Sequence, residues 1–371
     1  MRGVIRKRRE FLRLMRTCTL EQGYFTVTDI QKGAGVPRST AQDWINRLLD
    51  EGCVVVRERK MGRIPARYAA ISALPSSACR RIFTTTDGDR VEIHHECMSS
   101  ACAAFCAYHH SRAGGVLQGV ERDGTLLREW AHVGRRDVEI GLFPASSVGV
   151  AGVEKEGSDI IQHIRCIGGP AYSLTDMMAK AEGVCEVKIS REGKIVEGSV
   201  RTRALVHLVI GVDDTDSREG GATFALALAL LQHLETIRGV LPISHHVVML
   251  NPAIPQKTAG NSCSYIEVAI PPGQYENVRD RALFFVQDES LSPEWGIAMR
   301  RGFSVPPELR AFGERARREV ISIGEAEATA TRWEIDLFGG RGRIGALAAL
   351  ALSGLPHEVL LRPFAPIPPE T

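Results

Sequence analysis

The chain has 371 residues, of which 44% are hydrophobic and 24% charged, an ordinary composition for a globular protein of two or three domains. It contains no run of about 18 apolar residues, so no membrane span is expected, and its basic start MRGVIRKRREF lacks the apolar segment of a signal peptide. The net charge of +2 is uneven, because residues 1–70 carry 15 Lys and Arg against 7 Asp and Glu, which gives +8 there and −6 in the remainder. This asymmetry favours a nucleic-acid-binding end joined to a different kind of domain, and nine unevenly spread cysteines without an export signal favour a reducing cytoplasm.

Residues 1–75 are predicted to form a winged helix-turn-helix. A first helix is expected over about residues 4–17. A second is expected to begin at Thr28, where Thr28-x-x-Gln31 has the spacing of a capping box, and a third at Ser39, with a Ser-x-x-Gln pattern of the same kind. The sequence VVVRERKMGRIPARYAAI then alternates as two strands around a Met-Gly turn, which predicts the wing.

The third helix is the predicted recognition helix. Its apolar positions have the helical spacing of a core stripe, namely Ala41, Trp44, Ile45, Leu48 and Leu49. The polar residues left outside this stripe are candidates for base or phosphate contacts, namely Arg38, Thr40, Asp43, Asn46 and Arg47. The wing adds the candidate phosphate ligands Arg57, Arg59, Lys60, Arg63 and Arg67.

The density of arginine on the wing favours contact with DNA or RNA, and a winged helix that binds only protein is the alternative. The pattern does not distinguish DNA from tRNA. Winged helices often act as dimers, so a homodimer stays open, although no heptad seam is visible.

Residues 76–203 are predicted to form a mixed α/β domain that contains a Cys/His cluster. Its cysteines Cys97, Cys102 and Cys106 lie within ten residues, with Cys79 upstream and four histidines nearby. Three thiols and a fourth ligand suit a tetrahedral zinc site, and the same set suits an iron–sulfur cluster. The spacing is not the paired C-x-x-C of zinc ribbons. Small buried cysteines on an Ala-rich helix, or a redox-active thiol pair, therefore stay open.

Residues 204–371 are organised around the stretch LVHLVIGVDDTDSREGGATFALALALL at 205–231. Its apolar, β-branched first part predicts a buried strand, and Asp213, Asp214 and Asp216 follow at the carboxyl end of that strand. A glycine pair then leads into an apolar helix, whose N-terminus offers backbone N–H groups to an anion. Crowded carboxylates repel unless a cation intervenes, and Mg²⁺ is usually held by carboxylates together with substrate phosphates. The stretch therefore predicts a Mg²⁺-nucleotide site, with a solvated acidic turn as the alternative.

Two later loops have the composition of phosphate-binding segments. Lys257 and Thr258 lie in a loop rich in Pro, Asn and Gly between two predicted strands. GGRGRIGALAAL carries a G-x-G-x-x-G pattern before an Ala/Leu helix, which is a weak signal alone because no β-α-β unit follows. The glycines of this pattern, and the arginines that suit phosphate oxygens or are simply surface charges, are Gly340, Arg341, Gly342, Arg343 and Gly345.

The motifs GVDDTDSREGGAT, LNPAIPQKTAGN and GGRGRIGALAAL, in this order, resemble the ATP-binding part of the archaeal isoleucine-tRNA agmatinylcytidine synthetase family, and the related methanogenesis marker protein 11 looks closer. The resemblance covers about residues 204–363. It implies that the three acids bind Mg²⁺ and ATP, that Thr223 is phosphorylated in the reaction, and that Lys257 and Asn261 belong to a phosphate loop. In the synthetase family this module is N-terminal and is followed by an OB-fold and a zinc ribbon that engage tRNA, whereas here it is C-terminal. Ala222 stands where the family commonly has Cys.

The sequence thus predicts a multidomain protein of α+β and α/β character, with a winged helix, a Cys-containing middle domain and a C-terminal ATP-binding module. The first functional hypothesis is an ATP- and Mg²⁺-dependent enzyme of phosphoryl-transfer or ligase type, coupled to a nucleic-acid-binding winged helix. The alternative is a DNA-binding transcriptional regulator whose C-terminal domain senses a nucleotide without turnover. A third is an RNA-modification enzyme in which the winged helix replaces the OB-fold as the grip on tRNA.

Overall fold

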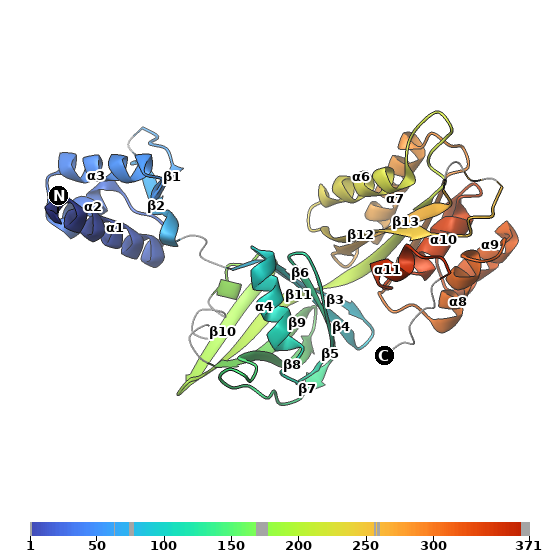
Figure 1. Cartoon of the computed structure of the whole chain (residues 1–371), viewed down its shortest axis with the longest axis horizontal. Coiled ribbons are helices and arrows are strands. Elements are labelled where there is room, and N and C mark those ends of the chain that lie inside the picture. Colours follow the sequence, from blue (N-terminus) through green and yellow to red (C-terminus); the bar gives the residue numbers. More distant parts are fainter. Residues whose placement is uncertain are drawn as a thin grey trace.

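The structure is a computed structural model that describes residues 2–62, 64–73, 78–167, 177–255, 257 and 260–364. Arg63 and Thr258, two of the candidate ligands, lie outside these residues. Figure 1 shows a helical N-terminal part, a strand-rich middle part, and a C-terminal part in which helices lie about a sheet. Among the described helices, none is both long and apolar enough to cross a membrane.

The N-terminal part has the predicted winged-helix order. Its elements are α1 (Arg2–Gln22), α2 (Val27–Ala34), α3 (Arg38–Asp50), β1 (Val54–Glu58) and β2 (Arg67–Ala70), followed by the short 3-10 helix η1 (Ile71–Ala73). The two strands pair antiparallel. The core stripe of α3 is confirmed, since Trp44 is buried and stacks on Phe11 of α1 with ring centroids 5.1 Å apart, and Ile45 and Leu48 are fully buried.

Both predicted helix starts in this part are wrong in detail. The capping box belongs to Thr26 and Asp29, not to Thr28: the Thr26 amide donates to the Asp29 carboxylate at 2.7 Å, and the Asp29 amide donates to the Thr26 hydroxyl at 3.4 Å. Helix α3 starts after Pro37, which makes no side-chain cap, so Ser39 already lies within the first turn. A proline preset at φ −58° starts the helix without a hydroxyl cap.

The middle part is mostly strands. They are β3 (Cys79–Asp87), β4 (Arg90–Cys97), β5 (Leu117–Asp123), β6 (Leu126–His132), β7 (Gly134–Arg135), β8 (Val148–Glu156), β9 (Asp159–Ile167) and β10 (Val184–Glu192), with one helix, α4 (Ser100–His110). Strand β11 (Ile195–Asp213) follows and is 19 residues long. Its first half pairs with β9 and β10, and Ala204–Val206 then pairs in parallel with β3. The strand predicted at 205–212 is therefore the second half of a longer element, which continues without a break through residue 203.

The C-terminal part is built on that second half of β11. Its elements are α6 (Thr223–Glu235), β12 (Leu241–Met249), β13 (Ser262–Ile270), α7 (Tyr275–Glu289), β14 (Gly296–Arg301), α8 (Pro307–Ala316), α9 (Ile323–Arg332), β15 (Asp336–Gly339), α10 (Arg343–Ala351) and α11 (His357–Leu360). The strand order is β12-β13-β11-β14-β15, and every one of these pairings is antiparallel. The mixed α/β content agrees with the prediction.

The two faces of β11 pack against different helices. Leu208, Ile210 and Val212 belong to the core under α6 and α7, whereas Val209 packs in the core with α8, α9 and α10. Gly211 allows α10 to lie directly on the strand, because a Cβ at this position would come 2.0 Å from a carbonyl oxygen of the helix. This close contact brings the N-terminus of α10 to the carboxyl end of β11.

Candidate functional site

The three predicted acids gather where β11 ends. Asp213 is the last residue of the strand, and Asp214 adopts a left-handed φ of 55°, which turns the chain sharply. Burial raises the pKa of Asp213 well above its ordinary value, and the neighbouring charges of Asp214 and Asp216 add to this effect. Burial also raises the pKa of Asp214, while Arg341 opposes the shift. A cation bound among these three acids would stabilise their ionised, carboxylate forms.

These acids form one wall of a cavity of about 280 Å³. Residues of all three sequence motifs line it, namely Asp213, Asp214, Asp216, Lys257, Asn261, Arg341, Gly342 and Gly345. Another part of the wall is mainly apolar and comes from the loop after β12, the segment between α8 and α9, and the start of α9, including Ile254, Val320 and Ile323. This apolar wall was not predicted, because its residues are dispersed in the sequence and carry no local pattern.

The glycine loop places the start of α10 against the acids. A Cβ on Gly345 would lie only 1.8 Å from Asp213 Oδ2, so the carboxylate rests on bare backbone in the first turn of the helix. The N-terminus of a helix carries partial positive charge, which favours a carboxylate or a bound phosphate at this position. Position 345 must therefore be a glycine, because a larger side chain would clash with Asp213.

The Lys257 loop is closed by Asn261. The Asn261 side-chain amide donates to the Asn251 carbonyl at 2.8 Å, and the Leu250 amide donates to the Asn261 carbonyl at 2.8 Å, so the two ends of the loop are joined. The Lys257 ammonium donates to the Pro252 carbonyl on the exposed side of the loop. Lys257 is thus held at the rim of the cavity with its charge solvated.

Three predicted residues, Thr223, Gly340 and Arg343, are not among the residues that line the cavity. Thr223, the first residue of α6, is 6% exposed, and its hydroxyl donates to Asp216 Oδ1 at 3.1 Å. Arg343 pairs with Glu327 at 2.8 Å and donates to the Gly340 carbonyl at 3.0 Å, while its neighbour Arg341 does line the cavity. Thr223 therefore contacts the acid cluster through Asp216, and Arg343 is paired with Glu327 outside the cavity.

The predicted nucleic-acid surface is polar and largely exposed. Its described members on α3 are Arg38, Asp43, Asn46 and Arg47, which are exposed, and Thr40, which is half-buried. On the wing Arg57, Arg59 and Lys60 are exposed, whereas Arg67 is half-buried and pairs with Glu58 at 3.0 Å. On α3 the guanidinium of Arg47 lies over the Trp44 ring at 5.4 Å, and Asn46 accepts a hydrogen bond from Gln42 at 2.9 Å. These contacts fix the side chains on the outer face of α3, the face a groove of a nucleic acid would meet.

The four candidate cysteines of the middle part are brought together but do not form a tight metal cage. Cys79 and Cys97 face each other across β3 and β4, and Cys102 and Cys106 lie on α4. A hydrogen bond from the Cys106 thiol lowers the pKa of Cys97 and raises that of Cys106. Within the described residues, the one group of three or more candidate ligands whose atoms lie within 4.8 Å of one another does not contain a cysteine. A metal at the cysteines stays a prediction.

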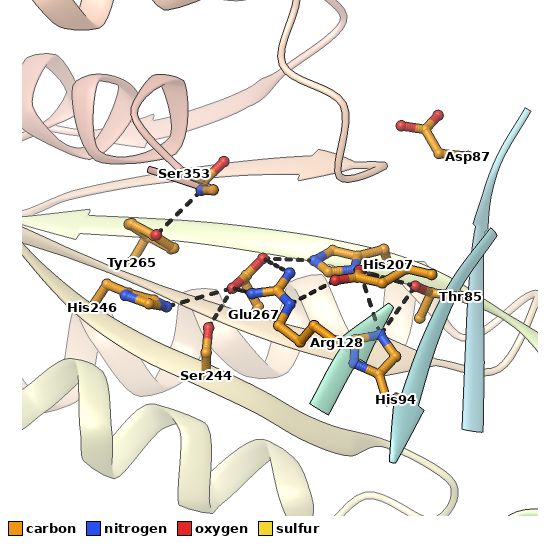
Figure 2. Close-up of polar contacts among 12 residues, drawn as sticks. Thr85, Asp87, His94, Arg128, His207, Ser244, His246, Tyr265, Glu267 and Ser353 are labelled. Atoms are coloured by element: carbon orange, nitrogen blue, oxygen red, sulfur yellow. Dashed lines mark hydrogen bonds and ion pairs between the residues drawn. The ribbon is translucent and has the colours of Figure 1, made fainter. Parts of the chain in front are cut away.

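That group consists of the buried side chains of Glu92, His94 and His207. The sequence analysis did not identify these three residues as a site. It lies among β3, β4 and β11 (Figure 2). Glu92 and His94 lie two residues apart on β4, but His207 comes from the distant strand β11, so no local spacing identifies the three together.

Comparison with known proteins relates the two ends of the chain to different families. Residues 209–304 match the TiaS TCKD domain, and residues 18–73 match the sugar-specific transcriptional regulator TrmB. The chain is 27% identical over 272 residues to "Uncharacterized protein MJ0921" of Methanocaldococcus jannaschii, which covers 71% of the chain and 89% of that protein. It is 34% identical over 152 residues to TiaS of Pyrobaculum neutrophilum, a 2-agmatinylcytidine synthetase for an isoleucine tRNA, which covers 39% of the chain and 35% of that enzyme.

A solved structure of TiaS covers a similar share of the chain. The crystal structure of TiaS in complex with its isoleucine tRNA and ATP has 26% sequence identity and a TM-score of 0.37, and covers 40% of this chain and 37% of that one. The chain thus spans about a third of the synthetases that it matches. It is related in part to TiaS and carries a TrmB-like helix-turn-helix region, so the predicted resemblance is confirmed at that level.

Proposed function

We propose that the cavity at the end of β11 binds Mg²⁺-ATP and that the protein uses it in a phosphoryl-transfer or ligase-type reaction on a nucleic acid held by the winged helix. The supporting observation is convergence. Asp213 and Asp214, Lys257 and Gly345 come from three separate segments and line one cavity. They come from the end of β11, the loop after β12 and the first turn of α10.

The residues present fit a magnesium nucleotide. Asp213, Asp214 and Asp216 supply hard oxygen ligands, and Mg²⁺ bound there would neutralise charge on the phosphates. Lys257 and the N-terminus of α10 supply positive charge for phosphate oxygens. The apolar residues in the wall of the cavity suit contact with a nucleobase. Catalysis here would consist of positioning and charge neutralisation.

Thr223 has two candidate roles within this proposal. Its hydrogen bond to Asp216 gives it a positioning role, since it holds one carboxylate in place. The resemblance to the synthetases instead implies that Thr223 accepts a phosphoryl group. Incubation with Mg²⁺-ATP followed by peptide mass spectrometry distinguishes them: a phosphorylated Thr223 peptide assigns the acceptor role, and an unmodified peptide during ATP turnover assigns the positioning role.

The nucleotide site is tested by calorimetric titration of ATP into the full chain, with and without Mg²⁺. Asp214→Asn should weaken Mg²⁺-dependent binding at least about tenfold, because one carboxylate ligand is lost. Asp280→Asn is the matched control, since Asp280 is an exposed carboxylate on α7 outside the cavity. Equal ATP affinity in the Asp214 variant and the control would overturn the assignment.

The acceptor we propose first is a tRNA, because the relatives that share the C-terminal region are named as 2-agmatinylcytidine synthetases of an isoleucine tRNA. A second function is favoured by the match of residues 18–73 to a transcriptional regulator, namely a DNA-binding protein that senses ATP without turnover. The two differ in their readouts. The enzyme hydrolyses ATP, or transfers a phosphoryl group from it, when tRNA is added. The regulator binds duplex DNA with an ATP-dependent affinity and leaves ATP intact.

A further inference from the structure

A buried polar cluster lies where the middle and C-terminal parts meet. Its members are Thr85 on β3, Glu92 and His94 on β4, and His207 on β11, and all four side chains are fully buried. They converge because β3 pairs with β11 just before His207. Figure 2 shows the rings of His94 and His207 near each other, with Thr85 beside both.

Five distances within this cluster are close to the edge lengths of a small tetrahedron. Glu92 Oε2 lies 3.0 Å from His207 Nδ1 and 3.4 Å from His94 Nε2. Thr85 Oγ1 lies 3.5 Å from Glu92 Oε2, 3.4 Å from His94 Nε2 and 3.4 Å from His207 Nδ1. Four ligands placed about 2.0–2.1 Å from a central zinc ion are about 3.3–3.4 Å from one another. Five of the six edges therefore agree with a zinc tetrahedron within a few tenths of an ångström.

Neighbouring charges hold the ligand atoms of Glu92 and His207 in place. His207 contacts Glu267 Oε1 through Nε2 at 3.0 Å. When Nε2 carries the proton, Nδ1 is unprotonated and its lone pair can bind a metal ion. The other oxygen of Glu92 accepts a hydrogen bond from Arg128 at 2.6 Å, and Arg128 also pairs with Glu267 at 2.8 Å. Metal-binding histidines and carboxylates are usually oriented in this way by a further carboxylate or cation.

The alternative is that hydrogen bonds and ion pairs hold this cluster together without a metal ion. Arg128 and a protonated His207 would balance Glu92 and Glu267, and the 3.0 Å contacts of His207 fit that state. The contacts of His94 and Thr85 do not fit it, because 3.4–3.5 Å is long for hydrogen bonds, which cluster near 2.7–3.0 Å. Apart from the 3.0 Å contact between Glu92 and His207, the contacts in this fully buried site are too long for good hydrogen bonds and have the spacing of ligands around an ion.

We propose that Glu92, His94 and His207, with the Thr85 hydroxyl in the fourth position, bind one divalent transition-metal ion, preferably Zn²⁺. Two imidazole ligands favour zinc over Mg²⁺, which prefers oxygen. The site is buried and has no open position, so the ion is structural and ties β3 and β4 to β11. It is separate from the acid cavity and from the cysteines.

The test is metal analysis of the full chain, purified without chelator and freed of any histidine tag. Stoichiometric zinc is expected in the parent protein and in His132→Gln, which replaces an exposed histidine of the same part. His94→Gln and His207→Gln should each reduce bound zinc at least tenfold. Cys106→Ser should retain it, which separates this site from the cysteines. Zinc lost in Cys106→Ser but kept in both histidine variants would overturn the proposal.

A second measurement does not depend on the folding of variants. Chelator should lower the melting temperature of the parent protein, and Zn²⁺ but not Mg²⁺ should restore it. Replacement by Co²⁺ should give the visible absorption of a tetrahedral site with nitrogen and oxygen ligands, without the intense charge-transfer band of thiolate. A parent protein that is zinc-free as purified and whose melting temperature does not respond to added Zn²⁺ would overturn the proposal.

Discussion

The substitution Gly345→Ala tests directly whether Asp213 is held against the first turn of α10. The new Cβ would lie 1.8 Å from Asp213 Oδ2, whereas real Cβ contacts are at least 3.0 Å, so the carboxylate or the helix must move by more than 1 Å. Overpacking of this kind costs about 1–3 kcal/mol of the free energy of unfolding. Misplacement of a ligand by about 1 Å reduces function by up to about 100-fold, so Mg²⁺-ATP affinity should fall by a factor between about 10 and 100.

The matched control is Gly324→Ala. Gly324 lies in the first turn of α9, beside the same cavity, and a Cβ there would meet nothing within 4 Å. Alanine restricts the unfolded chain and favours helix, so this change should raise the free energy of unfolding by about 0.4–1 kcal/mol and leave ATP affinity unchanged.

Urea unfolding and calorimetric titration of Mg²⁺-ATP measure both quantities for the two variants. The reasoning is refuted by a Gly345→Ala protein that is as stable as Gly324→Ala and binds Mg²⁺-ATP with parental affinity. That result would mean that Asp213 does not rest on α10 in solution.

Two further predictions concern other parts of the chain. Burial lowers the pKa of His246 from 6.5 to about 4, so the folded state binds fewer protons than the unfolded state between these values, and the stability due to the neutral ring is lost as the pH falls. The free energy of unfolding should drop by up to about 3 kcal/mol from this group between pH 6.5 and 4, and urea titrations of His246→Phe should lack that part of the drop. On the wing, the double change Arg59→Ala and Lys60→Ala should lower the slope of log affinity against log salt by about 2 in filter binding to the preferred nucleic acid, and an unchanged slope would exclude phosphate contacts there.

The features that the sequence predicted correctly are local ones. The β-branched run at 205–212 is a strand, and the apolar stripe of α3 is buried, because both patterns repeat within one element. The start of α2 was misassigned because two overlapping patterns compete: Thr26 is followed three residues later by Asp29, and Thr28 by a glutamine. Only the path of the chain before the helix decides which hydroxyl caps it.

The features that could not be predicted depend on pairing between distant segments. The sequence shows His207 as a single polar residue inside an apolar run, with nothing to indicate that β4 and β13 supply Glu92 and Glu267 as neighbours. The antiparallel order around β11 is equally invisible, because a central strand buried on both faces looks the same in a parallel or an antiparallel sheet.

Strand β11 is the element on which both proposed sites depend. Side chains alternate along a strand, so His207, Val209, Gly211 and Asp213 lie in one row on the face that meets α10. His207 and Asp213 are six steps apart, about 20 Å along the strand at about 3.3 Å per residue. The row passes from the histidine–glutamate cluster, through the core and the bare backbone contact at Gly211, to the acids of the cavity. The position of Asp213 against α10 thus depends on how the second half of β11 is held, and a structural ion at His207 would support the proposed nucleotide site by holding the middle of the strand, without touching the nucleotide.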